Sequence, residues 1–214
     1  SLCINNSNAL ILVYRASIYG NKDMTHLGFN DITMLSNMPN LMYLAPTTVE
    51  ELESSIRYGV EHHNHPIAIR IPVGLPIYET SQSNTTGCPV TSCNITQSGN
   101  TIAIIGVGNF YHKAVELSQA IHDSIHIFPT LVKPLCISSL DTDTLNELTK
   151  NHNIVITLED GELEGGYGQK IASYYGKTSM NVLNYGISKQ FYDRYNPEAV
   201  SYTHLRAHET LRHL

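Results

Sequence analysis

Short apolar runs alternate with amphipathic stretches of helical spacing, and this alternation constrains the fold more than any other feature of the chain. Residues Ala9–Tyr14 read A-L-I-L-V-Y, and Leu41–Ala45 and Ile67–Ile71 are two more strand-sized apolar runs. A continuous apolar run of this length is typical of a buried parallel strand. Helical patterns with short connections between such runs predict a right-handed parallel α/β sheet.

Two helices are expected between these three strands. A short one covers Asp31–Asn37. A longer one follows Pro46, where Thr48 and Glu51 have the spacing of a capping box. The apolar residues of this second helix recur at helical intervals, and they are Val49, Leu52, Ile56 and Val60.

A second α/β unit begins after a change of texture. Residues 76–100 are rich in Thr, Ser, Asn and Gln and are expected to form a linker with an edge strand in Val90–Ile95. Residues 101–199 predict a doubly wound sheet. Its expected strands are Ile102–Val107, Ile125–Thr130, Ile154–Leu158 and Asn181–Tyr185, and its expected helices are Phe110–His122, Asp141–Asn151, Gln169–Tyr175 and Ser188–Tyr195.

Composition excludes several classes of partner. The formal net charge of −6 gives no electrostatic case for binding nucleic acid. No apolar run approaches the roughly 20 residues that a membrane span needs.

Composition also indicates the compartment and the assembly. Four cysteines without a CxxC pair indicate reduced thiols of a cytoplasmic protein. Charged residues make up only 15% of the chain, which suggests a buried subunit surface.

Both ends of the chain have unusual features. Polar Ser1–Asn8 leads directly into a core strand, from which we expect a fragment of a longer protein. Residues 200–214 differ in texture from what precedes them. Their sequence resembles translated sequencing-adapter read-through, although His204 and His208 also have the spacing of a helical face or of a zinc pair. We expect this tail to be non-native and assign it no function.

Four sequence blocks carry distinctive motifs. They are R-A-S-I-Y-G-N-K-D-M-T-H-L-G-F-N-D-I (Arg15–Ile32), A-I-R-I-P-V-G (Ala68–Gly74), L-V-K-P-L (Leu131–Leu135) and T-L-E-D-G-E-L-E-G-G-Y-G (Thr157–Gly168). In the same order, they resemble the patterns D-R-A-G with T-H-x-G and F-D-I, then A-x-R-Y-P-R-G, F-V-K-P-L, and T-V-E-E-G followed by G-G-x-G. These patterns belong to the 1-deoxy-D-xylulose-5-phosphate synthase family of the transketolase superfamily, and the resemblance covers residues 1 to about 199.

The resemblance implies an incomplete parallel-sheet pyrimidine-binding domain in residues 1–75 and a transketolase C-terminal domain in residues 101–199. It implies a homodimeric, thiamine-diphosphate-dependent transferase that condenses pyruvate with glyceraldehyde 3-phosphate, in isoprenoid precursor, thiamine and pyridoxal biosynthesis. The family binds the diphosphate and Mg²⁺ through a G-D-G…N motif of a separate N-terminal domain. That motif is absent here, so we expect this polypeptide to be inactive alone.

Four residues are candidates for substrate contacts, namely Arg15, Arg70, His26 and Asp23. Arg15 follows one apolar strand and Arg70 lies near the end of another, so both are expected at the carboxyl edge of the sheet, where α/β ligands bind. Guanidinium groups bind phosphate bidentately, and the resemblance makes both arginines phosphate ligands. Proton transfer during C–C bond formation needs a side chain of the kind that histidine supplies, and by resemblance His26 is catalytic.

The chain departs from the family pattern at several of these positions. The acidic residue expected four before the histidine is Lys22, and Asp23, one step along, is the candidate substrate ligand in its place. The family's Asp and Gly of D-R-A-G are Tyr14 and Ser17, and the second Arg of Y-P-R-G is Val73. These changes suggest a divergent subgroup or another aldehyde acceptor.

Other functions stay open on sequence alone. The chain is alternatively the C-terminal subunit of a split transketolase, a 2-oxo acid dehydrogenase β subunit, or a non-catalytic dimerisation module. The glycine-rich turn Gly165–Gly168 opens a helix whose free N–H groups suit an anion, although helix packing at an interface is the favoured interpretation.

Overall fold

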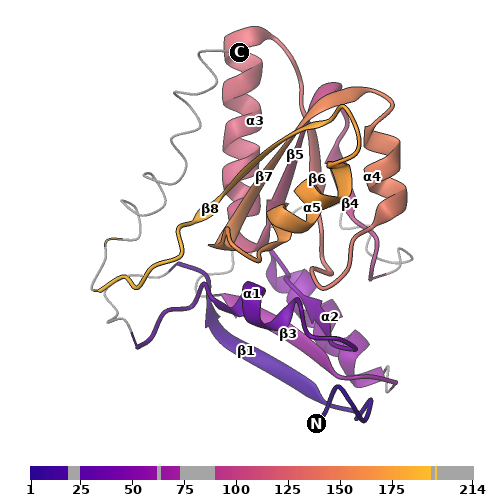
Figure 1. Ribbon diagram of the computed structural model, residues 1–214, viewed down its shortest axis with the longest axis vertical. Helices are drawn as coiled ribbons and strands as arrows, with labels where there is room; N and C mark the ends of the chain where they lie inside the picture. Colours follow the sequence, from indigo (N-terminus) through magenta and orange to yellow (C-terminus); the bar gives the residue numbers. More distant parts are fainter. Residues whose placement is uncertain (19–24, 62–63, 73–89, 194–195, 197–214) are drawn as a thin grey trace.

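The chain folds into two sheets of mainly parallel strands, each with helices packed against it. The computed structural model describes residues 1–18, 25–61, 64–72, 90–193 and 196. The first sheet has the order β1-β3-β2 and the second has the order β4-β6-β5-β7-β8. The α/β class with parallel sheets predicted from the sequence is confirmed (Figure 1).

The elements fall into two groups along the chain. The first group holds β1 (Leu10–Ala16), α1 (Asp31–Leu35), β2 (Met42–Leu44), α2 (Val49–Glu61) and β3 (Ile67–Pro72). The second group holds β4 (Asn94–Gln97), β5 (Thr101–Val107), the 3-10 turn η1 (Gly108–Phe110), α3 (Tyr111–Ile125), β6 (Thr130–Lys133), α4 (Thr142–Leu148), β7 (His152–Glu162), α5 (Tyr167–Tyr175) and β8 (Asn181–Ile187).

Side-chain alternation along β5 builds the core on both faces of the second sheet. Ile102 and Ile104 pack with α3 on one face, while Ala103 and Ile105 pack with α4 and α5 on the other. Figure 1 shows the same layering, with α3 on one side of the sheet and α4 and α5 on the opposite side. β4 pairs antiparallel with β6 at one edge of this sheet, within the segment expected to hold an edge strand.

One of the two hydrogen bonds of the predicted capping box forms at the start of α2. The Glu51 N–H donates to the Thr48 hydroxyl at 3.2 Å, as the box requires. The Glu51 carboxylate reaches one residue further back and accepts from the backbone N–H and hydroxyl of Thr47. Leu52 and Ile56 then cover the outer face of the first sheet, as their helical spacing predicts.

Expectations for four features of the second group of elements were wrong, namely the end of α3, the start of β6, a last helix and the end of β7. α3 continues to Ile125, where His126 takes a left-handed conformation and its N–H closes on the His122 carbonyl. The strand predicted from Ile125 therefore begins only at Thr130. Residues 188–193, expected to be helical, form no helix. β7 extends to Glu162, past the expected end at Leu158.

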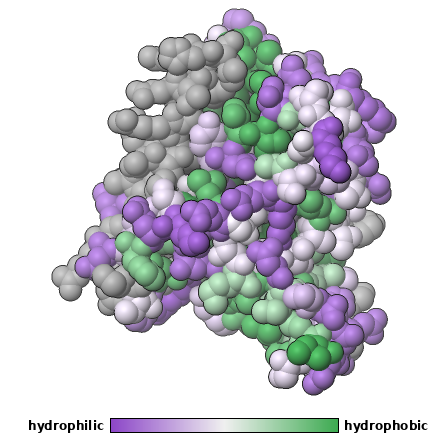
Figure 2. All heavy atoms as spheres, in the orientation of Figure 1, coloured by the Kyte–Doolittle hydropathy of each residue, from purple (hydrophilic) through white to green (hydrophobic). Residues whose placement is uncertain are grey.

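The inner face of the first sheet is covered by the second group of elements. The Ala45 N–H donates to the Leu135 carbonyl and the Ile137 N–H donates to the Tyr43 carbonyl, each at 2.8 Å. Residues 135–137 thus run alongside β2 and form backbone hydrogen bonds with it from the second group of elements. Apolar residues of both groups form one buried cluster, and hydrophilic side chains gather on the surface along this boundary (Figure 2). We call the boundary between the first group of elements (residues 10–72) and the second group (residues 94–187) the domain seam. No helix within the described ranges has the length and apolar character to cross a membrane.

Candidate functional site

The C-terminal end of β1 has an unusual backbone. Arg15 is exposed and has φ of 59°, and the pairing register with β3 slips between Tyr14 and Ala16. Ser17 follows with φ of 80° and is buried. Left-handed conformations cost free energy for residues with a Cβ and are concentrated at functional sites. Sequence reasoning placed Arg15 at this edge but gave no sign of the strained backbone.

A backbone hydrogen bond joins this strand end to the segment that holds His26. The Ser17 N–H donates to the Gly28 carbonyl at 2.7 Å. His26 is exposed, and its Nδ1 lies 2.8 Å from the Thr25 hydroxyl. The structure therefore brings the backbones of the Arg15 and His26 segments together. Asp23 and Lys22 lie outside the described residues, so the expected contact of Asp23 is not placed.

Arg70 is not available to a substrate in this chain. Its side chain is fully buried. Nε and Nη2 donate to Asp31 at 2.6 and 3.1 Å, Nη1 donates to Asp160 Oδ1, and Nη2 also donates to the Asp160 carbonyl at 3.0 Å. These bonds occupy four of the five guanidinium N–H groups. The expectation that Arg70 holds a phosphate is replaced by a structural role, because two carboxylates already neutralise it.

The electrostatics of this cluster fit an ion-pair network. Burial alone would lower the pKa of Arg70, but the carboxylates of Asp160 and Asp31 outweigh burial and raise that pKa. The Tyr43 hydroxyl donates to Asp31 Oδ2. Burial, together with Asp31, raises the pKa of Tyr43. The phenol of Tyr43 therefore stays protonated as a donor, and the guanidinium of Arg70 stays charged.

Glu159 explains the glycine-rich turn predicted to suit an anion. The Glu159 side chain is buried on β7 and accepts from the N–H groups of Tyr167 at 2.8 Å and Gly168 at 3.2 Å. These are free N–H groups of the first turn of α5, the part of a helix that attracts negative charge. Burial raises the pKa of Glu159 to about 7, although both N–H groups act to lower it. The chain's own carboxylate thus occupies the start of this helix.

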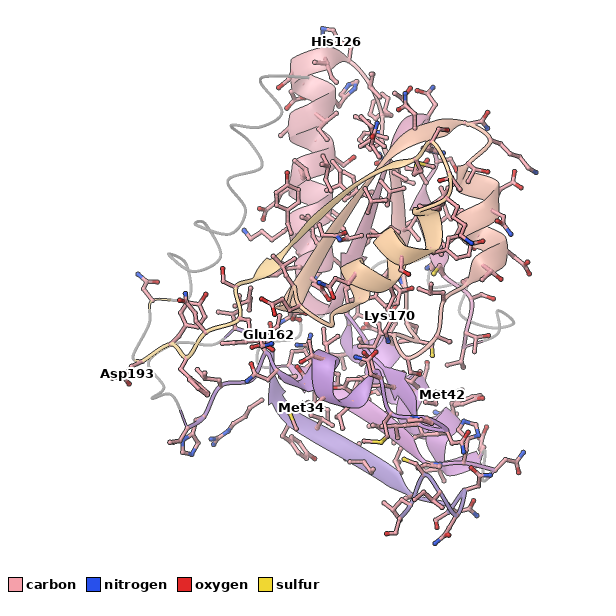
Figure 3. The ribbon with its side chains drawn as sticks, in the orientation of Figure 1. Met34, Met42, His126, Glu162, Lys170 and Asp193 are labelled. Atoms are coloured by element: carbon pink, nitrogen blue, oxygen red, sulfur yellow. The ribbon has the colours of Figure 1, made fainter. Side chains whose placement is uncertain are left out.

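Lys170 and Glu162 add polar contacts along the domain seam (Figure 3). The Lys170 ammonium donates to the Ser36 carbonyl at 2.7 Å, to the Ser36 hydroxyl at 3.0 Å and to the Ile137 carbonyl at 3.3 Å. Burial lowers the pKa of Lys170. The Glu162 N–H donates to the Phe29 carbonyl at 3.2 Å.

Arg15, His26 and Arg70, the predicted site residues that the structure describes, do not converge. Arg15 and His26 are exposed at the end of the first sheet, whereas Arg70 is inside the molecule. Two cavities of about 670 and 520 Å³ lie along the domain seam, and neither is lined by any of the three. Within the described part of the chain, no group of three or more His, Cys, Asp or Glu side chains could hold a metal ion.

Sequence reasoning also missed Asp31 and Asp160 as the partners of Arg70. Asp160 follows an apolar strand run and Asp31 opens a short helix, and in the sequence each belongs to a motif that does not mark it as a counter-ion. Arg70 lies inside an otherwise apolar strand, and a charge in such a place needs a partner that neutralises it. This signal indicates that a partner exists but does not identify it.

Comparison with known proteins identifies both halves of the chain. The family model described as transketolase, pyrimidine binding domain, matches residues 2–76, and that described as transketolase, C-terminal domain, matches residues 91–208. The second match begins inside the expected linker and ends inside the expected tail.

Curated relatives are named 1-deoxy-D-xylulose-5-phosphate synthase. The one from Alkaliphilus oremlandii is 35% identical over 78% of this chain and 26% of its own length, and the one from Gloeothece citriformis is 31% identical over 92% of this chain and 31% of its own length. The chain therefore spans less than a third of these relatives. A solved structure titled "Split gene transketolase, inactive beta4 tetramer" has a TM-score of 0.81 at 18% identity, covering 95% of this chain and 64% of that one.

Proposed function

Because this chain belongs to the transketolase family, we propose that it is the C-terminal part of a thiamine-diphosphate-dependent transferase that condenses pyruvate with glyceraldehyde 3-phosphate. The observation that supports this most directly is the Ser17–Gly28 hydrogen bond, which joins the Arg15 and His26 segments at the carboxyl edge of a parallel sheet. The relatives' names agree with this reaction, although the chain covers only 26% to 31% of their length.

Each exposed candidate has a definite role in the proposal. Arg15 binds the phosphate of the aldehyde acceptor through a bidentate pair of N–H groups. His26 exchanges a proton with the acceptor oxygen while the new C–C bond forms, a task that suits a group titrating near neutrality. Asp23 is proposed as a further substrate ligand on the same loop. Arg70 supports this edge from inside through Asp31.

The described residues do not fit the diphosphate or Mg²⁺. Asp31 and Asp160 are neutralised by Arg70, and Glu159 is bound by backbone N–H groups. The N–H groups of α5 that suit an anion are occupied by that same carboxylate. We therefore assign no step of the reaction on the cofactor to these residues, and we propose that the diphosphate and metal are bound by a domain outside this chain.

The test uses the complete coding sequence. A G-D-G…N domain upstream in the same reading frame supports a single-chain synthase. In the complete enzyme, R15M is expected to raise KM for glyceraldehyde 3-phosphate at least tenfold, and H26A is expected to lower kcat at least tenfold. R57M, which makes the same substitution as R15M at an exposed position of α2, serves as the matched control and should leave both unchanged. Unchanged kinetics in R15M and H26A would refute the proposed site.

A second candidate is the C-terminal subunit of a split transketolase. The fold likeness to a chain of a split-gene transketolase favours it. A start codon just upstream of residue 1, with no diphosphate-binding motif in frame, would support this alternative. In either case we propose a homodimeric assembly, and we expect the 214-residue chain alone to show no turnover with pyruvate, glyceraldehyde 3-phosphate, thiamine diphosphate and Mg²⁺.

A further inference from the structure

The segment that follows His26 is held by the C-terminal domain at two consecutive points. The Phe29 side chain is fully buried, packs with Ile187 and meets the Tyr192 ring edge-on at a centroid distance of 5.6 Å. The Phe29 carbonyl accepts from the Glu162 N–H at 3.2 Å. Phe29 is thus fixed by residues of β7, β8 and the chain after β8. None of these belongs to the three-stranded sheet whose strand β1 precedes the loop.

The second point is Asp31, two residues further on. Its carboxylate receives two hydrogen bonds from Arg70, and Arg70 in turn donates to the side chain and backbone of Asp160. Asp160 is completely buried, and its Oδ2 also accepts from the Asn109 N–H at 3.1 Å. Arg70 is therefore a bridge between the start of α1 and β7.

The α1 helix and the β7 strand pack in close contact, so an added side chain on β7 must displace Ile32. A Cβ added at Gly161 would lie 2.8 Å from Ile32 Cδ1. The Thr33 hydroxyl lies 3.4 Å from the Glu162 carboxylate. Because β7 belongs to a five-stranded sheet, it gives the start of α1 a rigid support.

We propose that Asp160 is a positioning residue that holds the His26 loop in place from the C-terminal domain. It acts through Arg70 on Asp31, so that the Gly28–Asp31 segment has one fixed course and Gly28 can accept from Ser17 beside Arg15. This inference rests on the proposed function, since it takes the loop to be a substrate-binding one. In this proposal the C-terminal domain contributes to substrate binding indirectly: its residues position the loop and do not contact the substrate.

Two amide hydrogens report directly on the loop. The Ser17 and Glu162 N–H groups donate to the Gly28 and Phe29 carbonyls, so their exchange rates rise when the loop leaves its place. The Ile67 N–H, which donates to the Ala9 carbonyl at 2.9 Å at the far end of the first sheet, is the internal reference. Exchange is measured on the 214-residue chain by NMR.

Two variants loosen the anchor by different routes. D160N removes the charge that holds Arg70, and G161A pushes Ile32 away without changing any charge. V155A removes volume from the buried part of β7 and serves as the control for global destabilisation. At matched overall stability, D160N and G161A are expected to speed exchange at Ser17 and Glu162 at least tenfold relative to Ile67, whereas V155A should change all three sites alike. The second variant keeps the test decisive if D160N fails to fold.

The same samples are titrated with glyceraldehyde 3-phosphate while the His26 ring resonances are followed. We expect D160N and G161A to weaken binding at least fivefold and V155A to leave it unchanged. Uniform exchange changes in D160N, or selective loosening with unaltered affinity, would overturn the inference. Failure of the unmodified chain to bind would count against the proposed role of Arg15 and His26, while the exchange pattern would still decide whether Asp160 anchors the loop.

Discussion

Asp160 and Arg70 form a completely buried ion pair between two strands of different domains, with the Arg70 Nη2 also donating to the Asp160 carbonyl at 3.0 Å. The same guanidinium binds Asp31 through Nε at 2.6 Å. A buried charge is tolerated only where its partners satisfy it fully, because burial removes its hydration. The domain seam therefore depends on a charged centre as well as on apolar packing.

Removal of the Arg70 charge should be strongly destabilising. R70M keeps an apolar chain of similar length but leaves Asp31 and Asp160 buried without their partner. Breaking a buried pair from one side costs about 3–5 kcal/mol. We expect urea denaturation of the 214-residue chain to show a loss of that size in the free energy of unfolding.

The control for R70M makes the same substitution at the surface. Arg57 is exposed on α2, and R57M should change the free energy of unfolding by less than about 0.5 kcal/mol. A loss in R70M no larger than that in R57M would mean that the network contributes nothing to stability.

Glu159 should make stability fall as pH rises. Its folded pKa of about 7 lies above the ordinary 4.5, so the folded state holds a proton that the unfolded state has lost between these values. The contribution of this group is fully present below about pH 4.5 and is lost as pH rises through 7, by up to about 3 kcal/mol. The advantage of the unmodified chain over E159Q should therefore be larger at pH 5 than at pH 8 in urea denaturation.

E147Q is the control for the Glu159 experiment. Glu147 is exposed on α4 and pairs with Lys150 at the surface, so its replacement should give nearly the same free-energy change at both pH values. The opposite trend at position 159, an advantage that grows with pH, would show that the N–H groups of Tyr167 and Gly168 stabilise the ionised carboxylate more than burial opposes it.

The apolar strands were predicted well because their signal is local. Ala9–Tyr14 and Ile67–Ile71 each lie within one residue or two of the observed β1 and β3. The predicted ends of strands and helices were less accurate, because the position of an end depends on the conformation of single residues. The left-handed His126 that closes α3, for example, has no distinctive neighbours in the sequence. The parallel order follows from alternation of element types, which the sequence displays throughout.

The role of Arg70 was not predictable in the same way. An arginine near the end of an apolar strand looks alike whether its partner is a phosphate or a carboxylate of the same chain. The carboxylates that bind it are 39 and 90 residues away in sequence, and only the packing of the two domains brings them together. The expected place of Arg15 at the sheet edge follows from the apolar strand before it, whereas that of His26 follows from the family resemblance, and their role as substrate contacts stays a prediction.

The left-handed conformation of Ser17 offers a route to a more stable protein. With φ of 80°, its Cβ opposes the neighbouring backbone, a strain that glycine does not have. S17G should raise the free energy of unfolding by about 1 kcal/mol. S17A keeps the Cβ and should give no such gain. Equal stabilities for S17G and S17A would indicate that the backbone there is unstrained.

Lys170 should hold the domain seam through hydrogen bonds rather than through charge pairing. All three of its ammonium N–H groups donate, to the Ser36 carbonyl, the Ser36 hydroxyl and the Ile137 carbonyl. Without Lys170 these acceptors lose a hydrogen-bond donor. K170M leaves those acceptors unsatisfied in a half-buried place, at a cost of about 1–3 kcal/mol. K177M makes the same change at an exposed position and should be nearly neutral.

Amide exchange should also report on Lys170. Ser36 and Ile137 lie on opposite sides of the seam, so K170M should speed amide exchange at Ile137, whose N–H donates to the Tyr43 carbonyl across the same boundary. Exchange at Ile137 as slow as in the unmodified chain would show that apolar packing and the Arg70 network hold the seam without Lys170.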